Sequence, residues 1–168
     1  MKLYEAMTVD PQTISSEATA QDAAIMMRDH NVGILPVMEN GNAIGVVTDR
    51  DLAIRALAGS SDPTHIPISQ VMTPEVLWIY EDEYLDDAIE AMSDRKISRL
   101  LVKNRNGKLI GILSAADVAT LSTRKRAGDL MSVLGGSYRH NHIASAAVCM
   151  FEPAPKEVLS APHTQSSK

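Results

Sequence analysis

GVVTDRD at residues 45–51 returns as GILSAAD at residues 111–117, with glycine, two apolar residues, a hydroxyl side chain and aspartate in the same places. Each copy closes a segment that opens with a Met-Thr pair, at residues 7–8 and again at residues 72–73. The apolar positions between these landmarks match at one constant spacing until a single extra residue near Gly107. Because a repeat of this size cannot bury its apolar face alone, we expect the two copies to pack together as one module.

The composition is that of a globular protein. The chain has 168 residues, of which 45% are hydrophobic, 22% charged and 4% aromatic, and this supplies enough apolar surface for a core. A net charge of -5 and a pI near 5.5 argue against a basic face for nucleic acid. No apolar run approaches the ~18 residues of a membrane helix, and the first residues lack the layout of a signal peptide. We therefore expect a cytoplasmic protein.

Each copy predicts the element order β-α-β-β-α. Alternating apolar residues, turn residues and a capping pattern at Thr19 divide the first copy in this way. The predicted elements are extended chain at 13–14, a helix ending near 31, strands at 34–38 and 43–48, and a helix at 49–58. In the second copy they are extended chain at 76–79, a helix at 84–95, strands at 99–103 and 109–113, and a helix from 115.

The predicted boundaries place the first motif at residues 1–62, the second at 63–122 and a C-terminal extension at 123–168. The extension begins with a predicted helix at 129–134, which Gly135-Gly136 should end. A short apolar stretch at 143–151 could dock as a further helix. From residue 152 onward Pro, Ser, Thr and Lys predominate, so we expect disorder.

The pattern as a whole resembles a tandem pair of CBS domains, the Bateman module. The resemblance covers about residues 1–122 and rests on three elements in both copies: the Met-Thr pair, the segment 32–37 or 97–102, and the closing heptad. It implies an α+β fold in which two CBS repeats pack as a pseudo-twofold pair. It also implies clefts between the repeats, which commonly hold adenosine-containing ligands.

In the second copy the resemblance implies a site made by Arg99, Ser114 and Asp117. Asp117 would accept hydrogen bonds from ribose hydroxyls, since a carboxylate can take two donors and suits a vicinal diol. The Ser114 hydroxyl, at the start of a helix, could meet a phosphate, which Arg99 can also reach. The ligand would lean on the main chain of the first copy from Thr8 to Ile14, including Thr13.

The first copy offers a weaker set. Thr48 and Asp51 match Ser114 and Asp117, but Ile34 stands where the second copy has Arg99. A phosphate there would need another donor, and Arg50 is the nearest candidate. Trp78, which matches Thr13, could border this cleft and stack on a base. We therefore predict that the two clefts differ in affinity.

Each of these assignments has a structural alternative. Ser/Thr-x-x-Asp before an apolar helix is also a capping signal, so Thr48 and Ser114 are expected to cap helices whatever else they do. Arg99 could form a surface ion pair, Arg50 could point to solvent, and Trp78 could be a half-buried strand residue. Gly45 and Gly111 are expected to mark close approach of two backbones.

The sequence therefore predicts a regulatory binding protein without catalytic residues, bound metal or required cofactor. Its expected ligand is AMP, ADP, ATP, NAD or S-adenosylmethionine, so energy sensing is one use. Cys149 and the tail histidines lie outside the repeats and make no catalytic or metal set. A homodimer and a protein effector are the expected partners. The alternatives are a structural dimerisation or docking module with empty clefts, and weak nucleic-acid binding through the basic residues 124–126.

Overall fold

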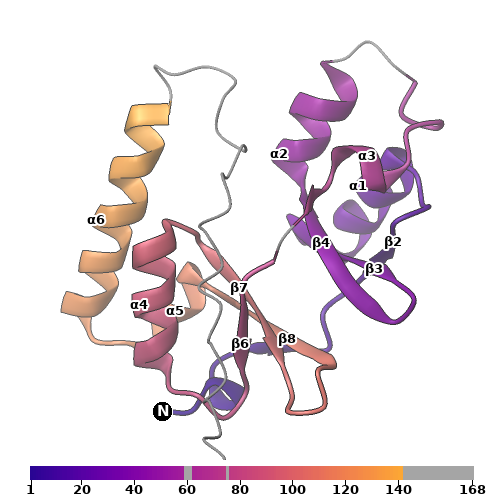
Figure 1. The fold of residues 1–168 in the computed structure, drawn as a ribbon. Helices are drawn as coiled ribbons and strands as arrows, with labels where there is room; N and C mark the ends of the chain where they lie inside the picture. The colour runs from indigo at the N-terminus through magenta and orange to yellow at the C-terminus, as the bar shows by residue number, and fades with distance from the viewer. Residues whose placement is uncertain (59–61, 75, 142–168) are drawn as a thin grey trace, which may run out of the picture.

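The chain folds into two lobes, each a four-stranded sheet with helices (Figure 1). The computed structural model describes residues 1–58, 62–74 and 76–141. Both lobes follow the predicted β-α-β-β-α order, so the expected pair of α+β repeats is confirmed. In the described part of the chain, no helix is both long and apolar enough to cross a bilayer.

The first lobe has the strand order β2-β3-β4-β5. β2 runs parallel to β3, and the β3–β4 and β4–β5 pairs are antiparallel. The strands are β2 (Ile14–Ser15), β3 (Ile34–Glu39), β4 (Asn42–Thr48) and β5 (Thr73–Pro74). The helices are α1 (Ala20–His30), α2 (Asp49–Asp51), the π-helical η2 (Leu52–Leu57) and α3 (Ile68–Val71).

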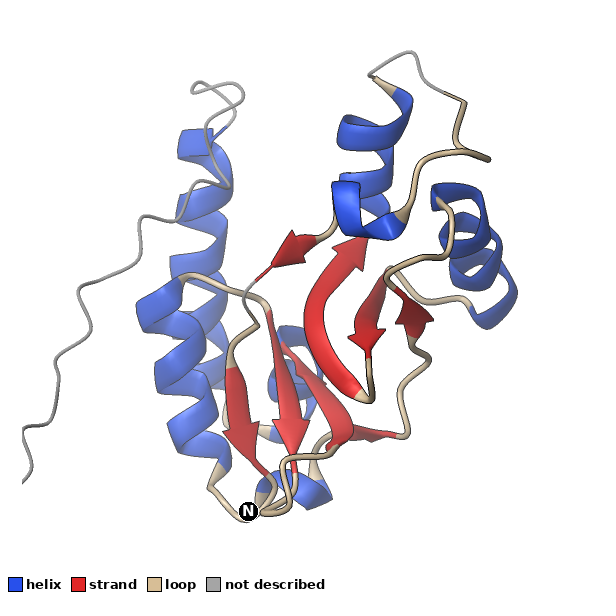
Figure 2. Cartoon of the chain, turned by 45° about the vertical axis from the view of Figure 1, so that its right-hand side comes forward, coloured by secondary structure: helices blue, strands red, loops and turns tan. Residues whose placement is uncertain are grey.

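The second lobe repeats this plan with the order β1-β8-β7-β6. Its strands are β1 (Thr8–Val9), β6 (Trp78–Tyr80), β7 (Arg99–Lys103) and β8 (Leu109–Ser114). Its helices are the 3-10 turn η1 (Leu3–Glu5), α4 (Leu85–Arg95), α5 (Ala115–Leu121) and α6 (Arg124–Asn141). Among the described elements, α6 has no counterpart in the first lobe, and it packs on α4 and α5 (Figure 2).

The two lobes exchange their opening segments. β1, from the first copy, pairs with β8 of the second, whereas β5, from the second copy, pairs with β4 of the first. The cores follow the strands, because Leu3 and Ala6 are buried in the second lobe while Ile68 and Val71 are buried in the first. The packing units therefore do not coincide with the copies read along the sequence.

Gly45 and Gly111 mark close approach of two backbones, as predicted. Gly45 lies where β5 pairs with β4, and Gly111 lies where β1 pairs with β8. A Cβ atom at Gly45 would lie 2.7 Å from the Thr73 carbonyl oxygen, and one at Gly111 would lie 3.0 Å from that of Thr8. Both distances are too short for an unstrained contact, so only glycine lets β5 and β1 approach. The glycine at this position of each copy is therefore needed for the exchanged strand to pair.

Helices α1 and α4 end in the same way. Asn31 and Lys96, which follow them, take left-handed backbone conformations with φ of 52° and 53°. Such a residue lets the chain reverse and present the last carbonyls of the helix to new donors. The reversal leads directly into β3 and β7, whose first residues, Ile34 and Arg99, face the space between the lobes.

Two helix predictions need correction. Residues 49–58 do not form one regular α-helix, since the chain winds as a π-helix from Leu52 to Leu57. The helix predicted to end at Gly135-Gly136 instead begins at Arg124 and continues to Asn141. A glycine ends a helix only when its backbone turns left-handed, and inside a helix it costs only about 1 kcal/mol. The stretch at 143–151 lies outside the described residues.

Candidate functional site

A cavity of about 380 Å³ lies between the two repeats. This volume falls in the range of small-molecule sites, roughly 300 to 1,000 Å³. Both copies supply its walls: the β1 end and the loop after it, the turn from α1 into β3, and the start of β7 with the β8–α5 junction. The lining residues are Thr8, Asp10, Pro11, Gln12, His30, Val32, Gly33, Ile34, Arg99, Ile112, Ser114 and Asp117.

The closing motif of the second copy caps α5 and still leaves one carboxylate oxygen available. The Ser114 hydroxyl accepts from the Asp117 amide at 3.2 Å and donates to Asp117 Oδ2 at 2.6 Å. The Ser114 amide also donates to Oδ2, at 2.8 Å. Among the described residues no donor contacts Asp117 Oδ1. Capping and ligand binding are therefore compatible, because each can use a different oxygen of Asp117.

Arg99 brings a cation to the same cavity. It is the first residue of β7 and lies opposite Ser114 in the strand register. The Arg99 side chain is exposed and forms no ion pair with the described residues, so the surface ion pair considered as its alternative is not present there. Ile34, its counterpart in the first copy, lines this cavity as well. The cavity therefore has one guanidinium, from Arg99, beside apolar lining residues such as Ile34.

The predicted contacts from the opening strand are partly displaced along the chain. Thr8 lines the cavity, as do residues 10–12 of the following loop. Thr13 and Ile14 do not line it, and Ile14 is only 4% exposed in the core of the first lobe. Of the predicted segment 8–14, Thr8 and residues 10–12 line this cavity.

The closing motif of the first copy has the same cap but a different neighbour. Thr48 donates to Asp51 Oδ2 from its amide at 2.9 Å and from its hydroxyl at 2.8 Å. The other oxygen, Asp51 Oδ1, lies 3.3 Å from Nη2 of Arg55, one turn later. Both carboxylate oxygens of Asp51 are thus engaged within the chain.

Arg50 and Trp78, the two further residues predicted for the first-copy site, lie on α2 and at the start of β6. Arg50 is exposed, and its backbone amide donates to Asp49 Oδ1 at 2.7 Å. Trp78 is half-buried on β6, in the second sheet, where Nζ of Lys103 lies 5.4 Å from the centre of its ring. Neither residue lines the cavity at Asp117, and their part in a first-copy site stays a prediction.

The prediction missed three residues that the structure brings forward. Asp10 and His30 line the cavity, and Arg55 contacts Asp51. The spacing of four between Asp51 and Arg55 is the familiar signal of an ion pair on one helix face. Asp10 gives no such signal, since its position depends on a left-handed turn with φ of 47° that its sequence does not announce.

The described residues contain no group of three His, Cys, Asp or Glu side chains that could hold a metal ion. Cys149 and His142 lie outside the described residues. Of the basic run 124–126, Arg126 forms an ion pair with Asp86 on α4. The chemistry that the cavity offers is hydrogen bonding and charge, from Arg99, the carboxylates of Asp10 and Asp117, and the hydroxyls of Thr8 and Ser114.

Two sequence comparisons both relate this chain to CBS domains. The profile of the CBS domain matches the chain twice, over residues 3–57 and 68–123. The CBS domain-containing protein YhcV of Bacillus subtilis is 38% identical over 115 residues, which make up 68% of this chain and 81% of that protein. The two CBS matches cover both repeats and leave the C-terminal extension after residue 123 uncovered.

Solved structures share the fold. TA0289 of Thermoplasma acidophilum, a CBS domain protein of unknown function, gives a TM-score of 0.71 at 23% identity, covering 79% of this chain and 75% of that one. The CBS domain pair of MJ0100, solved with 5-methylthioadenosine and S-adenosyl-L-methionine, gives 0.64 at 28% identity over 72% and 94%. CBSX2, solved with AMP, gives 0.59 at 26% identity over 71% and 93%.

Proposed function

The chain belongs to the CBS domain family, and on this basis we propose that it is a regulatory protein that binds an adenosine-containing ligand in the cavity between its repeats. The cavity carries the proposal, because it gathers Arg99, Ser114 and Asp117 against the opening segment of the other copy. Two of these groups each match one part of a nucleotide, and Ser114 holds Asp117 in place through its hydroxyl. Asp117 Oδ1 suits a ribose hydroxyl, and Arg99 suits a phosphate.

AMP is the ligand that we expect to bind most tightly among AMP, ADP, ATP, NAD and S-adenosylmethionine. Arg99 is the one permanent cation among the lining residues, and Asp10 and Asp117 add negative charge. One guanidinium can compensate one phosphate, whereas further phosphates would face the carboxylates. The complexes of CBSX2 with AMP and of MJ0100 with S-adenosyl-L-methionine support an adenosine derivative in general.

Regulation would follow from the position of the cavity. Its walls come from both repeats, so a ligand there contacts both at once. A ligand can shift an equilibrium between two arrangements only by the difference in its affinity for them. A ligand that bridges the walls favours the arrangement in which they lie close together. We propose that this shift is the signal that a protein effector reads.

Calorimetric titration of the full chain with AMP, ATP, NAD, S-adenosylmethionine and adenosine tests the proposal. We expect AMP to bind, Asp117→Ala to weaken AMP and adenosine alike, and Arg99→Ala to weaken AMP while sparing adenosine. Removing one charge-assisted contact should reduce affinity roughly tenfold or more. If correctly folded protein binds none of these compounds, the proposal fails and the docking-module alternative is favoured.

Self-association is the second part of the proposal. Ile54 and Leu57 on η2 are 52% and 62% exposed, and no helix formed by residues 1–58, 62–74 and 76–141 covers the helices of the first lobe as α6 covers those of the second. We propose that a second copy of the chain covers this surface, as a symmetric dimer would. Sedimentation should give a dimer that Ile54→Asp dissociates.

We also propose that the protein binds its nucleotide without turning it over. A nucleotide incubated with the protein for a long time should therefore be recovered unchanged.

A further inference from the structure

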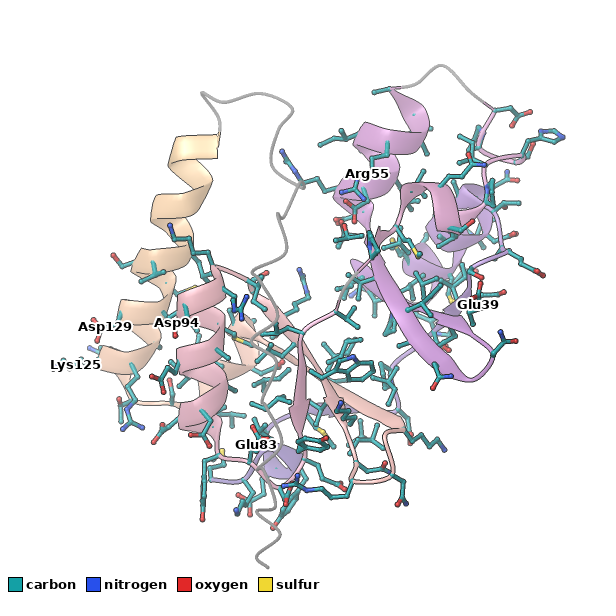
Figure 3. The ribbon with its side chains drawn as sticks, in the orientation of Figure 1. Glu39, Arg55, Glu83, Asp94, Lys125 and Asp129 are labelled. Atoms are coloured by element: carbon teal, nitrogen blue, oxygen red, sulfur yellow. The ribbon has the colours of Figure 1, made fainter. Side chains whose placement is uncertain are left out.

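Arg55 holds together two parts of the first lobe that belong to different copies. Its Nη1 donates to the carbonyl oxygens of Val71 and Met72, both at 2.9 Å, and to the Thr73 hydroxyl at 3.2 Å. Its Nη2 lies 3.3 Å from Asp51 Oδ1. One guanidinium therefore joins the closing motif of the first copy to the opening segment of the second. Figure 3 shows Arg55 on the helical segment that follows β4.

This ion pair is more sheltered than the others that the described residues form. The side chains of Arg55 and Asp51 are 27% and 13% exposed, whereas those of Arg105 and Asp82 are 62% and 49% exposed. Exposed pairs contribute little, but a sheltered guanidinium with several acceptors is held firmly. Arg55 is therefore a fixed part of the first lobe and not a solvated side chain.

The same positions in the second copy form the cavity. Thr73 of β5 corresponds to Thr8 of β1, and Asp51 corresponds to Asp117; Thr8 and Asp117 both line the cavity. Arg55 corresponds to Leu121, which has no charge and is 40% exposed. The guanidinium of Arg55 thus contacts the counterparts of two residues that, in the second copy, are left to a ligand.

We infer that Arg55 occupies the adenosine site of the first copy from within the chain, so that each chain takes up a single ligand, in the cavity at Asp117. This inference rests on the proposed function of that cavity. A ribose needs an acceptor oxygen, and both oxygens of Asp51 are already engaged. A ligand at Asp51 would have to displace Arg55 and leave the carbonyls of Val71 and Met72 without their donor, which opposes binding.

Exchanging the two residues tests the inference from both sides. Amide signals of isotope-labelled protein near Asp51 and near Asp117 report the two sites separately during titration with AMP and with adenosine. In the unchanged protein only signals near Asp117 should shift. In Arg55→Leu a second site should appear at Asp51, and the added change Asp51→Ala should remove it. Arg50→Leu, which removes an exposed arginine from the same helical segment, should leave the single site as it was.

The reverse change, Leu121→Arg, places a guanidinium one turn after Asp117. We expect it to reduce AMP affinity in the cavity roughly ten- to a hundredfold, because the ligand must then displace a charge-assisted pair. Leu121→Met, similar in size and uncharged, should bind as the unchanged protein does. Leu121 is partly exposed, so the arginine should be tolerated in the fold. This variant decides the question if Arg55→Leu does not fold.

The outcomes separate this inference from the proposed function. Undiminished AMP binding by folded Leu121→Arg would overturn the role given to Arg55 while the cavity remained a nucleotide site. Folded Arg55→Leu without a second site would overturn it as well, as would a signal at Asp51 in the unchanged protein. If the unchanged protein binds no adenosine compound, the proposed function fails; a site gained by Arg55→Leu would then still support the block by Arg55.

Discussion

The helices that close the two repeats begin alike and then diverge. Thr48 and Ser114 cap them with the same hydrogen bonds, and Asp51 and Asp117 supply the same returning carboxylate. One turn later the first helix has Arg55, bound to its own Asp51, and the second has Leu121. The shared motif therefore specifies how a helix starts, whereas the residue four positions after the aspartate decides whether the carboxylate is left for a ligand.

The largest effect is expected from adding a methyl group at the glycines of the exchanged strands. Gly111→Ala would push β1 away from β8, and Gly45→Ala would push β5 away from β4. Each should lower the free energy of unfolding by about 2 to 3 kcal/mol, measured by urea denaturation. Only Gly111→Ala should also abolish AMP binding, since β1 carries Thr8; equal loss of binding in both would contradict the difference between the sites.

The helix caps should show a smaller and unequal effect. Ser114→Ala leaves the Asp117 carboxylate with one donor, the amide of residue 114, whereas Thr48→Ala leaves the Asp51 carboxylate with two, the amide of residue 48 and the Arg55 guanidinium. We expect Ser114→Ala to cost about 1 to 2 kcal/mol of stability and Thr48→Ala to cost less. Thermal unfolding of both variants checks this, with Thr19→Ala as a cap that lies outside both motifs. A larger cost for Thr48→Ala would show that Arg55 does not support Asp51.

A stabilising change is available at the end of α4. Lys96 takes the left-handed conformation that Asn31 takes at the end of α1, and asparagine tolerates it better than lysine. Lys96→Asn should therefore raise the free energy of unfolding by roughly 0.5 kcal/mol. The reverse change, Asn31→Lys, should lower it by a similar amount. Chemical denaturation of both variants tests whether the two helix ends are interchangeable.

The smallest effect concerns pH. Hydrogen bonds from the side chain and backbone of Thr19 hold the pKa of Asp22 below its ordinary value. The ionised carboxylate therefore stabilises α1 fully above the ordinary pKa near 3.9, and this contribution is lost as the pH falls through the lowered pKa. The melting temperature of Asp22→Asn should fall short of that of the unchanged protein at about pH 6 and approach it at about pH 2.5. A constant difference would mean that Asp22 keeps its ordinary pKa.

Much of the fold could be predicted because the chain repeats itself. The strands at 34–38 and 99–103, the capped helices and the close approach at Gly45 and Gly111 all follow from local patterns read twice. The exchange of β1 and β5 could not be predicted in this way, because each short strand pairs with residues far along the chain. The extent of α6 was missed for another reason: glycine permits a helix end but does not require one.

The candidate site was predictable only in its central part. Thr8, Arg99, Ser114 and Asp117 line one cavity, as the resemblance implied. Thr13 and Ile14 follow the lining residues Pro11 and Gln12 but do not line the cavity themselves, and Ile14 is instead buried in the core of the first lobe. Arg55 was missed because a sheltered ion pair and a solvated arginine share the same sequence, and only its acceptors at Val71 and Met72 distinguish them.

The exchanged opening strands also bear on how the protein is made. During synthesis, residues 8–9 leave the ribosome about a hundred residues before their partners at 111–112, so β1 must remain unpaired until nearly both repeats exist. Closing so long a loop is slow compared with forming a hairpin. The wall of the cavity formed by Thr8 should therefore be among the last parts to assemble, and a nascent chain should be unable to hold its ligand before the second repeat is complete.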